Sequence, residues 1–422
     1  MRVIYICLLY AIGPFLWLSL WWRGQRLPAY RHRRFERFGH VRVAPVGVAV
    51  WVHAVSVGET MAALPLIRAL VARHGRGRVF VTSGTPTGSE RVQVALGDQV
   101  QHSYAPYDLP HVVQRFLDRL QPQQVVVMET ELWPCLFRQL RRRRVPLVIA
   151  NARLSARSLK GYGRVPRFAA DVLGDITLVA AQSETDAERF RQLGAPRVET
   201  LGNLKFDVEP DAAQVAAGRA DRARWGDVPV WVAASTHEGE DARVLAAHRH
   251  LRAQLPRAVL ILVPRHPQRF QRVAERIAAQ GWQLQTRSAG GPTAQVPEVL
   301  LGDSMGEMWH YLAMADVAFV AGSFAPIGGH NVLEPAVLGL PVLFGPHMHN
   351  FRPAADLLTA AGGGIEVADE TALAARLVEL LPDAGRRQQA GAAALAALQP
   401  SRGALAAHLR ALCPPAPEPA HG

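Results

Sequence analysis

Several segments of the chain place acidic, basic or hydroxyl side chains directly after apolar runs, where they could do chemistry. The first is HAVSVGET, residues 53–60, which follows an apolar run and opens a helical pattern. In a nucleotide-binding strand–helix unit this turn usually carries glycines that make room for a phosphate. Here a single Gly58 is followed at once by Glu59. By position alone, the Glu59 carboxylate complements the helix dipole, an interaction worth about 0.3–1 kcal/mol.

Three further charged residues stand near strand ends in the first half of the chain. Glu129 and Glu131 flank Thr130 after the predicted strand QQVVVME. If this segment stays extended, the two carboxylates point to opposite sides, so only one can enter a site at the strand end. Lys205 is one of only two lysines, whereas arginine is used almost everywhere else. It indicates a place where a compact ammonium fits and a guanidinium does not, unless it is an ordinary surface lysine.

Hydroxyl and backbone groups in the second half could hold a nucleotide. The segment AASTHEGE ends a predicted strand in Ser235 and Thr236 and then starts a helix with acidic residues. A hydroxyl pair there either caps the helix, which is the simpler interpretation, or holds a phosphate beside exposed N–H groups. In GDSMGEMWHYLAMAD, a short stretch could offer backbone groups to the edge of a base, although any loop could: Gly306, Glu307 and Met308.

Arginines gather at two places. In LVPRHPQRF, Pro264 ends a predicted strand and Arg265 and His266 follow; the two prolines fix the turn, so Arg265 is expected to point into a cleft, where a guanidinium suits phosphate. In LFRQLRRRRVP, residues 136–146, the arginines lie at a helix end, where a solvated face is the default. Beside a membrane anchor, that patch could instead meet anionic headgroups.

The densest signal is GSFAPIGGHNVLEPA, residues 322–336, which reads as a strand, a glycine-rich turn and a short helix. Gly328 and Gly329 allow close backbone approach at the start of the helix. Asn331 and Glu334 are three residues apart, hence on one helical face, and a carboxylate there can accept both hydrogen bonds of a ribose diol. Together these residues predict a nucleotide site.

Composition bounds the kind of protein. The chain has 422 residues, of which 49% are hydrophobic and 19% charged, enough for two globular α/β domains and not typical of a disordered chain. The net charge of +12 requires that acidic partners be considered: nucleic acid, anionic lipid or phosphorylated substrates. Cys7, Cys135 and Cys413 are far apart, which argues against a disulfide framework or a thiolate zinc site.

The N-terminus predicts membrane attachment. Residues 3–22 contain no charged side chain, and as a helix they would span roughly 30 Å. A run of arginines follows, against only Arg2 before it, so the positive-inside rule places the rest of the chain in the cytoplasm, at the inner membrane. A cleaved signal peptide fits poorly because no small-residue cleavage site precedes the arginines. Pro14 keeps open a helix lying in the interface.

Past this segment, short apolar runs alternate with helical patterns, as in parallel sheets covered on both faces. Two such series predict an α/β fold of two doubly wound, Rossmann-like domains facing one cleft. We expect an anchor at 1–22, a first domain at 23–208, a linker at 209–229, a second domain at 230–412 and a disordered tail at 413–422.

Read together, the motifs identify a family. HAVSVGET, TPTGSERV, METELWP, IANARLSARS, GNLKFD, STHEGE, PRHPQRF and GGHNVLEPA occur in order, and the chain resembles the 3-deoxy-D-manno-octulosonic acid (Kdo) transferases almost end to end. The resemblance implies a GT-B glycosyltransferase of lipopolysaccharide synthesis. Such an enzyme moves Kdo from CMP-Kdo to a lipid A precursor, lipid IVA, with inversion and without a metal or other cofactor.

The resemblance also implies residue roles. Glu59 would be the general base, and of the two glutamates after QQVVVM it selects Glu129 to assist, together with Lys205. Glu131 is then expected to cap the following helix. Lys205 could stabilise the donor carboxylate or the leaving phosphate. Contacts to CMP would come from Pro264, Arg265, Gly306, Glu307, Met308, Asn331, Val332, Leu333 and Glu334.

Two other functions stay open from the residues. A GT-B sugar-nucleotide epimerase needs no lipid acceptor, and the apolar N-terminus speaks against it. A basic nucleic-acid-binding protein would need arginines interleaved with aromatic residues on an exposed face; we expect no nucleic-acid partner. His347 and His349 have no adjacent acidic residue, so we expect no metal there. The number of Kdo units, the acyl pattern and the oligomeric state do not follow from the sequence.

Overall fold

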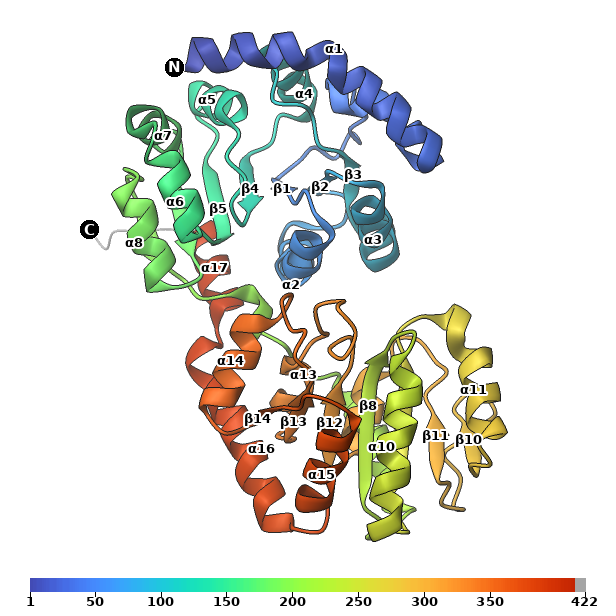
Figure 1. Cartoon of the computed structure of the whole chain (residues 1–422). Coiled ribbons are helices and arrows are strands. Elements are labelled where there is room, and N and C mark those ends of the chain that lie inside the picture. Colours follow the sequence, from blue (N-terminus) through green and yellow to red (C-terminus); the bar gives the residue numbers. More distant parts are fainter. Residues whose placement is uncertain (414–422) are drawn as a thin grey trace, which may run out of the picture. The chain divides into compact units, whose positions relative to one another are not determined.

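The chain divides into two units, which are described separately (Figure 1). The computed structural model describes residues 1–413. Unit 1 comprises Met1–Asp207 and the segment that begins at Arg402, and unit 2 comprises Val208–Ser401. Apart from Cys413, the tail predicted at 413–422 lies outside the described residues.

Unit 1 is built on a parallel sheet with the strand order β3-β2-β1-β4-β5-β6-β7. Its strands are β1 Val50–His53, β2 Val79–Ser83, β3 Gln101–Tyr104, β4 Gln124–Met128, β5 Leu147–Ala152, β6 Leu178–Ala181 and β7 Val198–Thr200. Its helices, after the N-terminal one, are α2 Val57–His74, α3 Pro86–Leu96, α4 Pro110–Leu120, α5 Pro134–Arg142, α6 Ala156–Tyr162, α7 Pro166–Leu173, α8 Glu184–Gln192 and α17 Ala404–Leu412.

Unit 2 repeats this architecture with the strand order β10-β11-β9-β8-β12-β13-β14, again with every pair parallel. Its strands are β8 Val230–Thr236, β9 Val259–Pro264, β10 Leu284–Thr286, β11 Val299–Leu301, β12 Val317–Val320, β13 Val342–Phe344 and β14 Gly364–Glu366. Its helices are α9 Ala212–Ala223, α10 Glu240–Gln254, α11 Phe270–Ala279, α12 Met308–Met314, α13 Leu333–Val337, α14 Arg352–Ala360, α15 Glu370–Leu380 and α16 Ala384–Leu398.

The apolar runs form strands because both faces of each sheet are covered. Along β1, Trp51 packs into the core on one face, whereas Val50 and Val52 pack into the core on the other. The same alternation places Trp231 of β8 on one face and Val232 on the opposite one. Burial on both faces explains why these strands are continuously apolar, as the sequence predicted.

Two strands were missed in the sequence analysis, and both lie at sheet edges. Strand β3 begins with Gln101 and His102, which are only half-buried, and it pairs on one side with β2. Strand β14 pairs only with β13, and its last residue, Glu366, is exposed. Strand β3 reads QHSY and β14 reads GIE, so neither contains the apolar run by which the central strands were predicted.

The predicted domain borders need two corrections. The segment 209–229, predicted as a linker, contains helix α9, which packs on α12 inside unit 2. The predicted second domain, 230–412, loses its last helix: α17 packs against α2 in unit 1. Helix α9 buries only a narrow stripe of side chains, which includes Val215 and Gly218. The rest of its sequence is small or polar, and such a composition is also typical of a linker.

The N-terminal helix α1, Arg2–Arg26, lies across α4 and α5 on the surface of unit 1 (Figure 1). Arg2 donates hydrogen bonds to Asp171 and Asp175, and the Tyr5 hydroxyl donates to Asp108. In the part of the chain that the structure describes, no single helix is both long enough and apolar enough to cross a membrane. Two segments of α1 meet these conditions only when taken together, on length and composition alone, and they meet at a 45° bend: Arg2–Gly13 and Phe15–Gln25.

Helix α17 is tied to the sheet of unit 1 through a buried histidine. The Nε2 atom of His408 accepts a hydrogen bond from the backbone N–H of Asn151 at 3.0 Å, and its Nδ1 atom contacts the Ala404 carbonyl oxygen at 2.7 Å. The Asp207 carboxylate accepts the N–H groups of Gly403 and Leu405 at the start of the same helix. The chain thus returns to unit 1 by specific polar contacts.

Replacing His408 with leucine tests this tie. We expect the free energy of unfolding of unit 1 to fall by about 1–3 kcal/mol, because the buried N–H of Asn151 would lose its acceptor. Urea unfolding followed by circular dichroism measures the change. His250→Leu is the control, because His250 is exposed on α10; an equal loss in both variants would contradict the tie.

Candidate functional site

In each unit, several candidate residues follow the two neighbouring central strands at which the strand order reverses. In unit 1, β1 and β4 are neighbours, and Glu59 and Glu129 follow them. In unit 2, β8 and β12 are neighbours, and the segments AASTHEGE and GSFAPIGGHNVLEPA follow them. Parallel strands all end at the same edge, and doubly wound sheets bind ligands at this switch point.

The Glu59 side chain is folded back over the turn that precedes α2. Its carboxylate accepts the N–H of Val55 at 2.9 Å and the hydroxyl of Ser56 at 2.8 Å. In return, Ser56 caps the helix by accepting the N–H of Glu59 at 3.1 Å. The residue is 8% exposed. This reciprocal pair resembles a capping box, so the helix-end role expected from position alone is present.

The carboxylate of Glu59 nevertheless holds its proton unusually well. Burial raises its pKa from an ordinary value of 4.5 to about 7, against the opposing effect of the bonds from Ser56 and Val55. The negative charges of Glu131 and Glu129 raise the pKa further. A group with a pKa near neutrality is suited to take and release a proton at physiological pH, as a general base must.

The alternation expected of an extended segment does not apply to Glu129 and Glu131, because the segment is not extended. Glu129 has a left-handed backbone with φ of +57°, so the chain turns directly after β4. Both carboxylates then lie close enough to Glu59 to raise its pKa. The prediction that Glu131 caps α5 is wrong: its carboxylate accepts the indole N–H of Trp133 at 2.9 Å, and no side chain caps that helix.

Lys205 joins the same group of residues. Its ammonium donates to Glu129 Oε1 at 3.2 Å, across 76 positions of sequence. The two side chains are 36% and 22% exposed, so this ion pair is accessible to a bound ligand. Lys205 sits on the short turn Leu204–Phe206, where Asn203 accepts its N–H at 3.0 Å. The structure therefore brings Glu59, Glu129 and Lys205 together.

Asn151, which the sequence analysis did not single out, positions that turn. It lies in β5 with φ of +54°, and its side-chain oxygen accepts the N–H of Leu204 at 2.9 Å. Its side-chain Nδ2 atom is buried and has no hydrogen-bond partner among the described residues. An asparagine near a strand end tolerates a left-handed backbone, but that signal alone does not reveal which neighbour it holds.

In unit 2, the dominant structural feature is a glutamate that was predicted only as part of a helix start. Glu240 is 1% exposed, and its carboxylate accepts the N–H groups of His237, Gly322, Phe324 and Ala325 at 2.8–3.3 Å. These donors come from the turns after β8 and β12. A charge-assisted strut of this kind fixes the two turns relative to each other.

Contacts within unit 2 explain why glycine is present at positions 328 and 329. Both have positive φ, +110° and +75°, and a side chain at Gly328 would collide with Asn350 Nδ2 at 2.3 Å. At Gly329 it would collide with Met348 Sδ at 2.2 Å. The N–H of Gly329 already donates to Gly322 O at 2.8 Å. The glycines thus admit another loop of the protein, and close approach to a phosphate is not needed to explain them.

Asn331 and Glu334 are close, although not as two positions of one helix. Helix α13 begins at Leu333, and Asn331 precedes it, where its side-chain oxygen accepts the N–H of Leu333 at 3.1 Å. Burial raises the pKa of Glu334, and a hydrogen bond with Asn331 and the charge of Arg265 oppose this rise. Val332 and Leu333 are buried beneath them.

The hydroxyl of Thr236 is used inside the protein. It is fully buried and donates to Asp241 Oδ1 at 2.7 Å, so it is not placed to hold a phosphate. Ser235 is half-buried and has a left-handed φ of +62°. Pro264 ends β9, and the charge of Arg265 reaches His237, His330 and Glu334, whose pKa values it lowers.

In the segment Gly306–Met308, the side chain of Glu307 forms an ion pair and the backbone turns at Gly306. Arg287 donates to both carboxylate oxygens of Glu307, at 3.0 and 2.7 Å, and holds its pKa at about 2. Gly306 has φ of +82°, and Met308 begins α12. Any ligand contact of this segment is therefore expected from its backbone, as predicted.

The arginines after the fourth strand have a structural use. Within 136–146, three arginines form ion pairs inside unit 1 with Asp171, Asp175 and Asp118; they are Arg138, Arg141 and Arg143. Within residues 1–413, no group of three or more histidine, cysteine, aspartate or glutamate side chains is arranged to hold a metal ion.

Comparison with known proteins gives the same assignment as the motifs. The family model for 3-deoxy-D-manno-octulosonic-acid transferase (kdotransferase) matches residues 32–208. A 3-deoxy-D-manno-octulosonic acid transferase of Haemophilus influenzae is 40% identical over 410 residues, which cover 96% of each chain. That of Bordetella pertussis is 40% identical over 408 residues, covering 94% of this chain and 95% of its own.

Among solved structures, MurG of Acinetobacter baumannii superimposes with a TM-score of 0.53, covering 87% of this chain and 99% of its own. At 12% identity this likeness shows the fold alone. Two doubly wound parallel sheets of this kind define a protein of the GT-B fold, one of the folds of glycosyltransferases. The chain belongs to the 3-deoxy-D-manno-octulosonic acid (Kdo) transferase family, which confirms the resemblance read from its motifs.

The pH dependence of stability tests the buried state of Glu59. The folded protein keeps a proton that the unfolded chain releases above pH 4.5, so stability falls from about pH 4.5 to about pH 7 and is level above. In Glu59→Gln this loss is absent. The unfolding free energy of the variant minus that of the wild type should rise by about 3 kcal/mol across this window. Glu90→Gln, at an exposed position of α3, is the control and should show a constant difference.

Proposed function

We propose that this protein transfers Kdo from CMP-Kdo to a lipid A precursor, lipid IVA, in lipopolysaccharide synthesis, with Glu59 as the general base. The observation that carries the proposal is the buried Glu59 carboxylate with a pKa of about 7, beside the Glu129–Lys205 ion pair, in a Kdo transferase. The acceptor reacts through a sugar hydroxyl, which is a poor nucleophile until its proton is removed.

In the proposed transfer step, the two substrates and Glu59 account for every bond and for the proton. The acceptor oxygen attacks the anomeric carbon of Kdo from the face opposite the phosphate, and the bond from that carbon to the phosphate oxygen breaks. The proton of the hydroxyl passes to Glu59, and CMP leaves with the electron pair of the broken bond. Attack from the opposite face inverts the anomeric configuration.

Glu129 and Lys205 assist in complementary ways. The charge of Glu129 raises the pKa of Glu59 and so strengthens it as a base. The Lys205 ammonium, held by Glu129 at 3.2 Å, provides a positive charge for the Kdo carboxylate or the departing phosphate. Its compact shape explains why a lysine stands here in an arginine-rich chain.

Unit 2 would bind the CMP part of the donor. Support comes from the strand ends at the switch point, where Arg265 supplies a guanidinium for phosphate and Glu334 a carboxylate for the ribose. The backbone of Gly306–Met308 would meet the base. Nothing in this reaction requires nucleic acid, and the positive net charge suits an anionic lipid and a nucleotide equally well.

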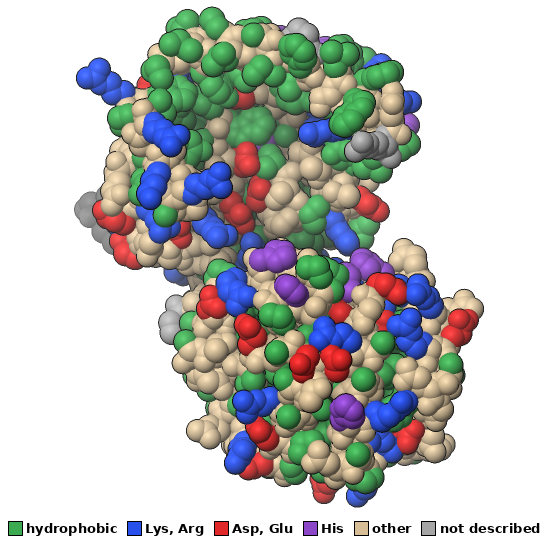
Figure 2. Space-filling view, in the orientation of Figure 1, with side chains coloured by type: hydrophobic (Ala, Val, Ile, Leu, Met, Phe, Trp, Pro, Cys, Tyr) green, Lys and Arg blue, Asp and Glu red, His purple; other side chains and the backbone are tan. Residues whose placement is uncertain are grey.

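We also propose that α1 attaches the protein to the cytoplasmic face of the inner membrane by lying in the interface. Its inner side is packed on unit 1, whereas its outer side exposes large apolar residues at 55–72%: Val3, Ile4, Leu8, Phe15, Leu18, Trp21 and Trp22. Figure 2 shows hydrophobic side chains gathered over this part of unit 1. Helix α1 is apolar on both sides and is held against unit 1. Such a helix is better suited to lie in the membrane–water interface than to cross the bilayer.

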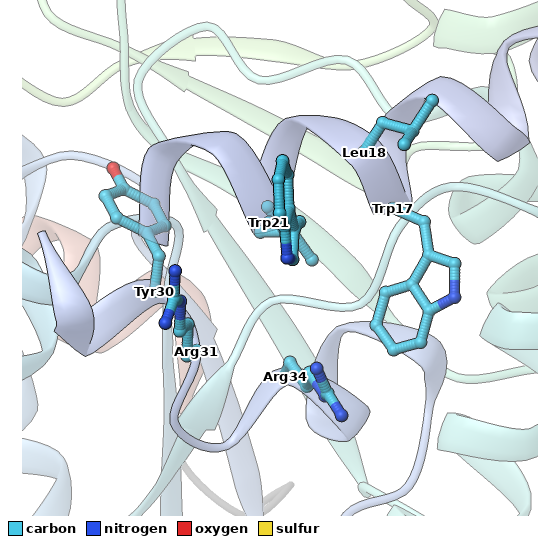
Figure 3. Close-up of a pocket in the computed structure, with 7 residues that line it drawn as sticks. Trp17, Leu18, Trp21, Tyr30, Arg31 and Arg34 are labelled. Carbon is cyan, nitrogen blue, oxygen red and sulfur yellow. The ribbon is translucent and has the colours of Figure 1, made fainter. Parts of the chain in front are cut away.

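The C-terminal half of α1 adds a place for headgroups. A pocket of about 560 Å³ lies between α1 and the segment after it, and Figure 3 shows Trp17, Trp21 and Tyr30 around it with Arg31 and Arg34. The Arg34 guanidinium lies over the Trp17 ring at 4.9 Å from its centre. Aromatic rings beside arginines are typical of the boundary between lipid tails and anionic headgroups.

The catalytic proposal is tested by Glu59→Gln in an assay of purified protein with CMP-Kdo and tetraacylated lipid A precursor, without divalent metal, read by mass spectrometry. We expect kcat to fall about 10²–10⁴-fold, because the amide cannot take a proton. In the wild type, kcat should rise with pH up to about 7 and then level off, because the base must be ionised. Glu90→Gln should keep wild-type activity; undiminished turnover of Glu59→Gln would contradict the role of the base.

The membrane proposal is tested with the double variant Leu18→Glu, Trp21→Glu in flotation with vesicles that contain anionic phospholipid. Two charges on the outer side of α1 should reduce the bound fraction at least tenfold, because a charged side chain is costly to insert. Val94→Glu is the matched control, since Val94 is 76% exposed on α3 and lies outside α1. Equal binding of all three proteins would contradict attachment through α1.

A further inference from the structure

Histidines gather at the edge of the unit 2 sheet where its central strands end. His266 follows β9, His237 follows β8 and His330 lies in the loop after β12, and these three strands are adjacent in the order β9-β8-β12. Figure 2 shows histidine side chains concentrated at one end of unit 2. None of the three was assigned a role above.

Two of these rings are in direct contact. The planes of the His237 and His330 rings are 8° apart and the ring centres are 4.9 Å apart, with the two Nε2 atoms facing each other at 2.7 Å. The His266 ring meets His237 edge-on, with centres 5.2 Å apart. Gly322 makes room for this arrangement, because a side chain there would meet the His330 ring at 2.8 Å.

The contact requires one proton between the two Nε2 atoms. For two neutral rings to share an Nε2–Nε2 hydrogen bond, one ring must carry its proton on Nε2 and the other on Nδ1. One Nδ1 atom of the pair is then an unprotonated acceptor. A further proton on that atom converts it into a charged donor and leaves the Nε2–Nε2 bond in place.

The surroundings keep the free pair neutral. Burial, followed by the charges of His237, Arg265 and His266, lowers the pKa of His330 to about 3. The pKa of His237 is lowered by burial and by His266, Arg269 and Arg265, while the charge of Glu240 opposes this. A bound anion would offset the arginine charges and favour the protonated pair.

We propose that His237 and His330 form a proton-coupled anion subsite, which takes up one proton when the phosphate group of the donor nucleotide binds beside them. The inference rests on the proposed binding of CMP-Kdo by unit 2. In this subsite the arginine at 265 supplies a permanent charge, and the histidine pair supplies a charge that appears only with the ligand. The charge is then available to the phosphate as CMP departs.

The test uses the methyl ester of CMP, a phosphodiester that keeps one negative charge throughout the neutral pH range. Isothermal titration calorimetry at pH 7 in buffers of different ionisation enthalpy counts the protons taken up on binding to the full chain. We expect proton uptake that increases as the pH is lowered, and an affinity that rises by up to about tenfold for each pH unit of acidification between about pH 8 and 6.

In His237→Gln and in His330→Gln, we expect the proton uptake and the pH dependence to disappear, because an amide keeps a hydrogen bond but does not titrate. His250→Gln, at an exposed position of α10, is the control and should behave as the wild type. Circular dichroism verifies that each variant is folded. Glutamine can form hydrogen bonds as histidine does but stays neutral, so these variants separate the effect of the histidine charge from that of its hydrogen bonds.

Two results would overturn the inference. If the wild type binds the ester with constant affinity and no proton uptake, or if uptake persists in both variants, the pair is not the proton acceptor, and the proposed Kdo transfer is unaffected. If folded wild-type protein does not bind the ester at all, both the subsite and the proposed nucleotide role of unit 2 are wrong.

Discussion

All strands of each sheet run parallel, and this constraint decides where the chemistry of both units lies. Parallel strands end at one edge, so every turn that follows a strand is delivered there, and the neighbouring strands at the switch point bring distant segments together. Glu129, which follows β4, and Lys205, which follows β7, are both delivered to this edge and meet across 76 positions. The same constraint places His237 beside His330, 93 positions apart.

Each unit buries a glutamate at the first turn of the helix that follows its central strand, and the two are used differently. Glu240 receives four backbone N–H groups from two turns, so its charge is fully compensated and it acts as a strut. Glu59 receives one N–H and one hydroxyl, and lies near two other carboxylates. Fewer donors and like charges leave Glu59 with a proton affinity suited to catalysis.

Helix α1 packs on unit 1 along one side and exposes apolar side chains along the other. Arg2 and Tyr5 tie it to unit 1, and its other side exposes Leu18, Trp21 and Trp22. A soluble protein seldom exposes so continuous an apolar face without a partner. The segment that looked from its composition like a membrane span is thus also an integral part of the surface of unit 1.

The family, the two-unit α/β class and the central strands could all be predicted from the sequence, which also placed Glu59 and Glu129 directly after strands of one sheet. This was possible because the central strands are apolar on both faces and the motifs stand directly after them. Strands β3 and β14 and helix α9 were not predicted, because none of the three contains a continuous apolar run.

The contacts of each side chain became visible only in the folded structure. It showed that Glu131 lies near Glu59 because Glu129 turns the chain, and that Gly329 makes room for Met348. It also revealed the positioning role of Asn151 and the contact between His237 and His330. Local sequence sets the backbone of each turn, but burial, charge and contact between distant turns arise only when the strands are assembled side by side.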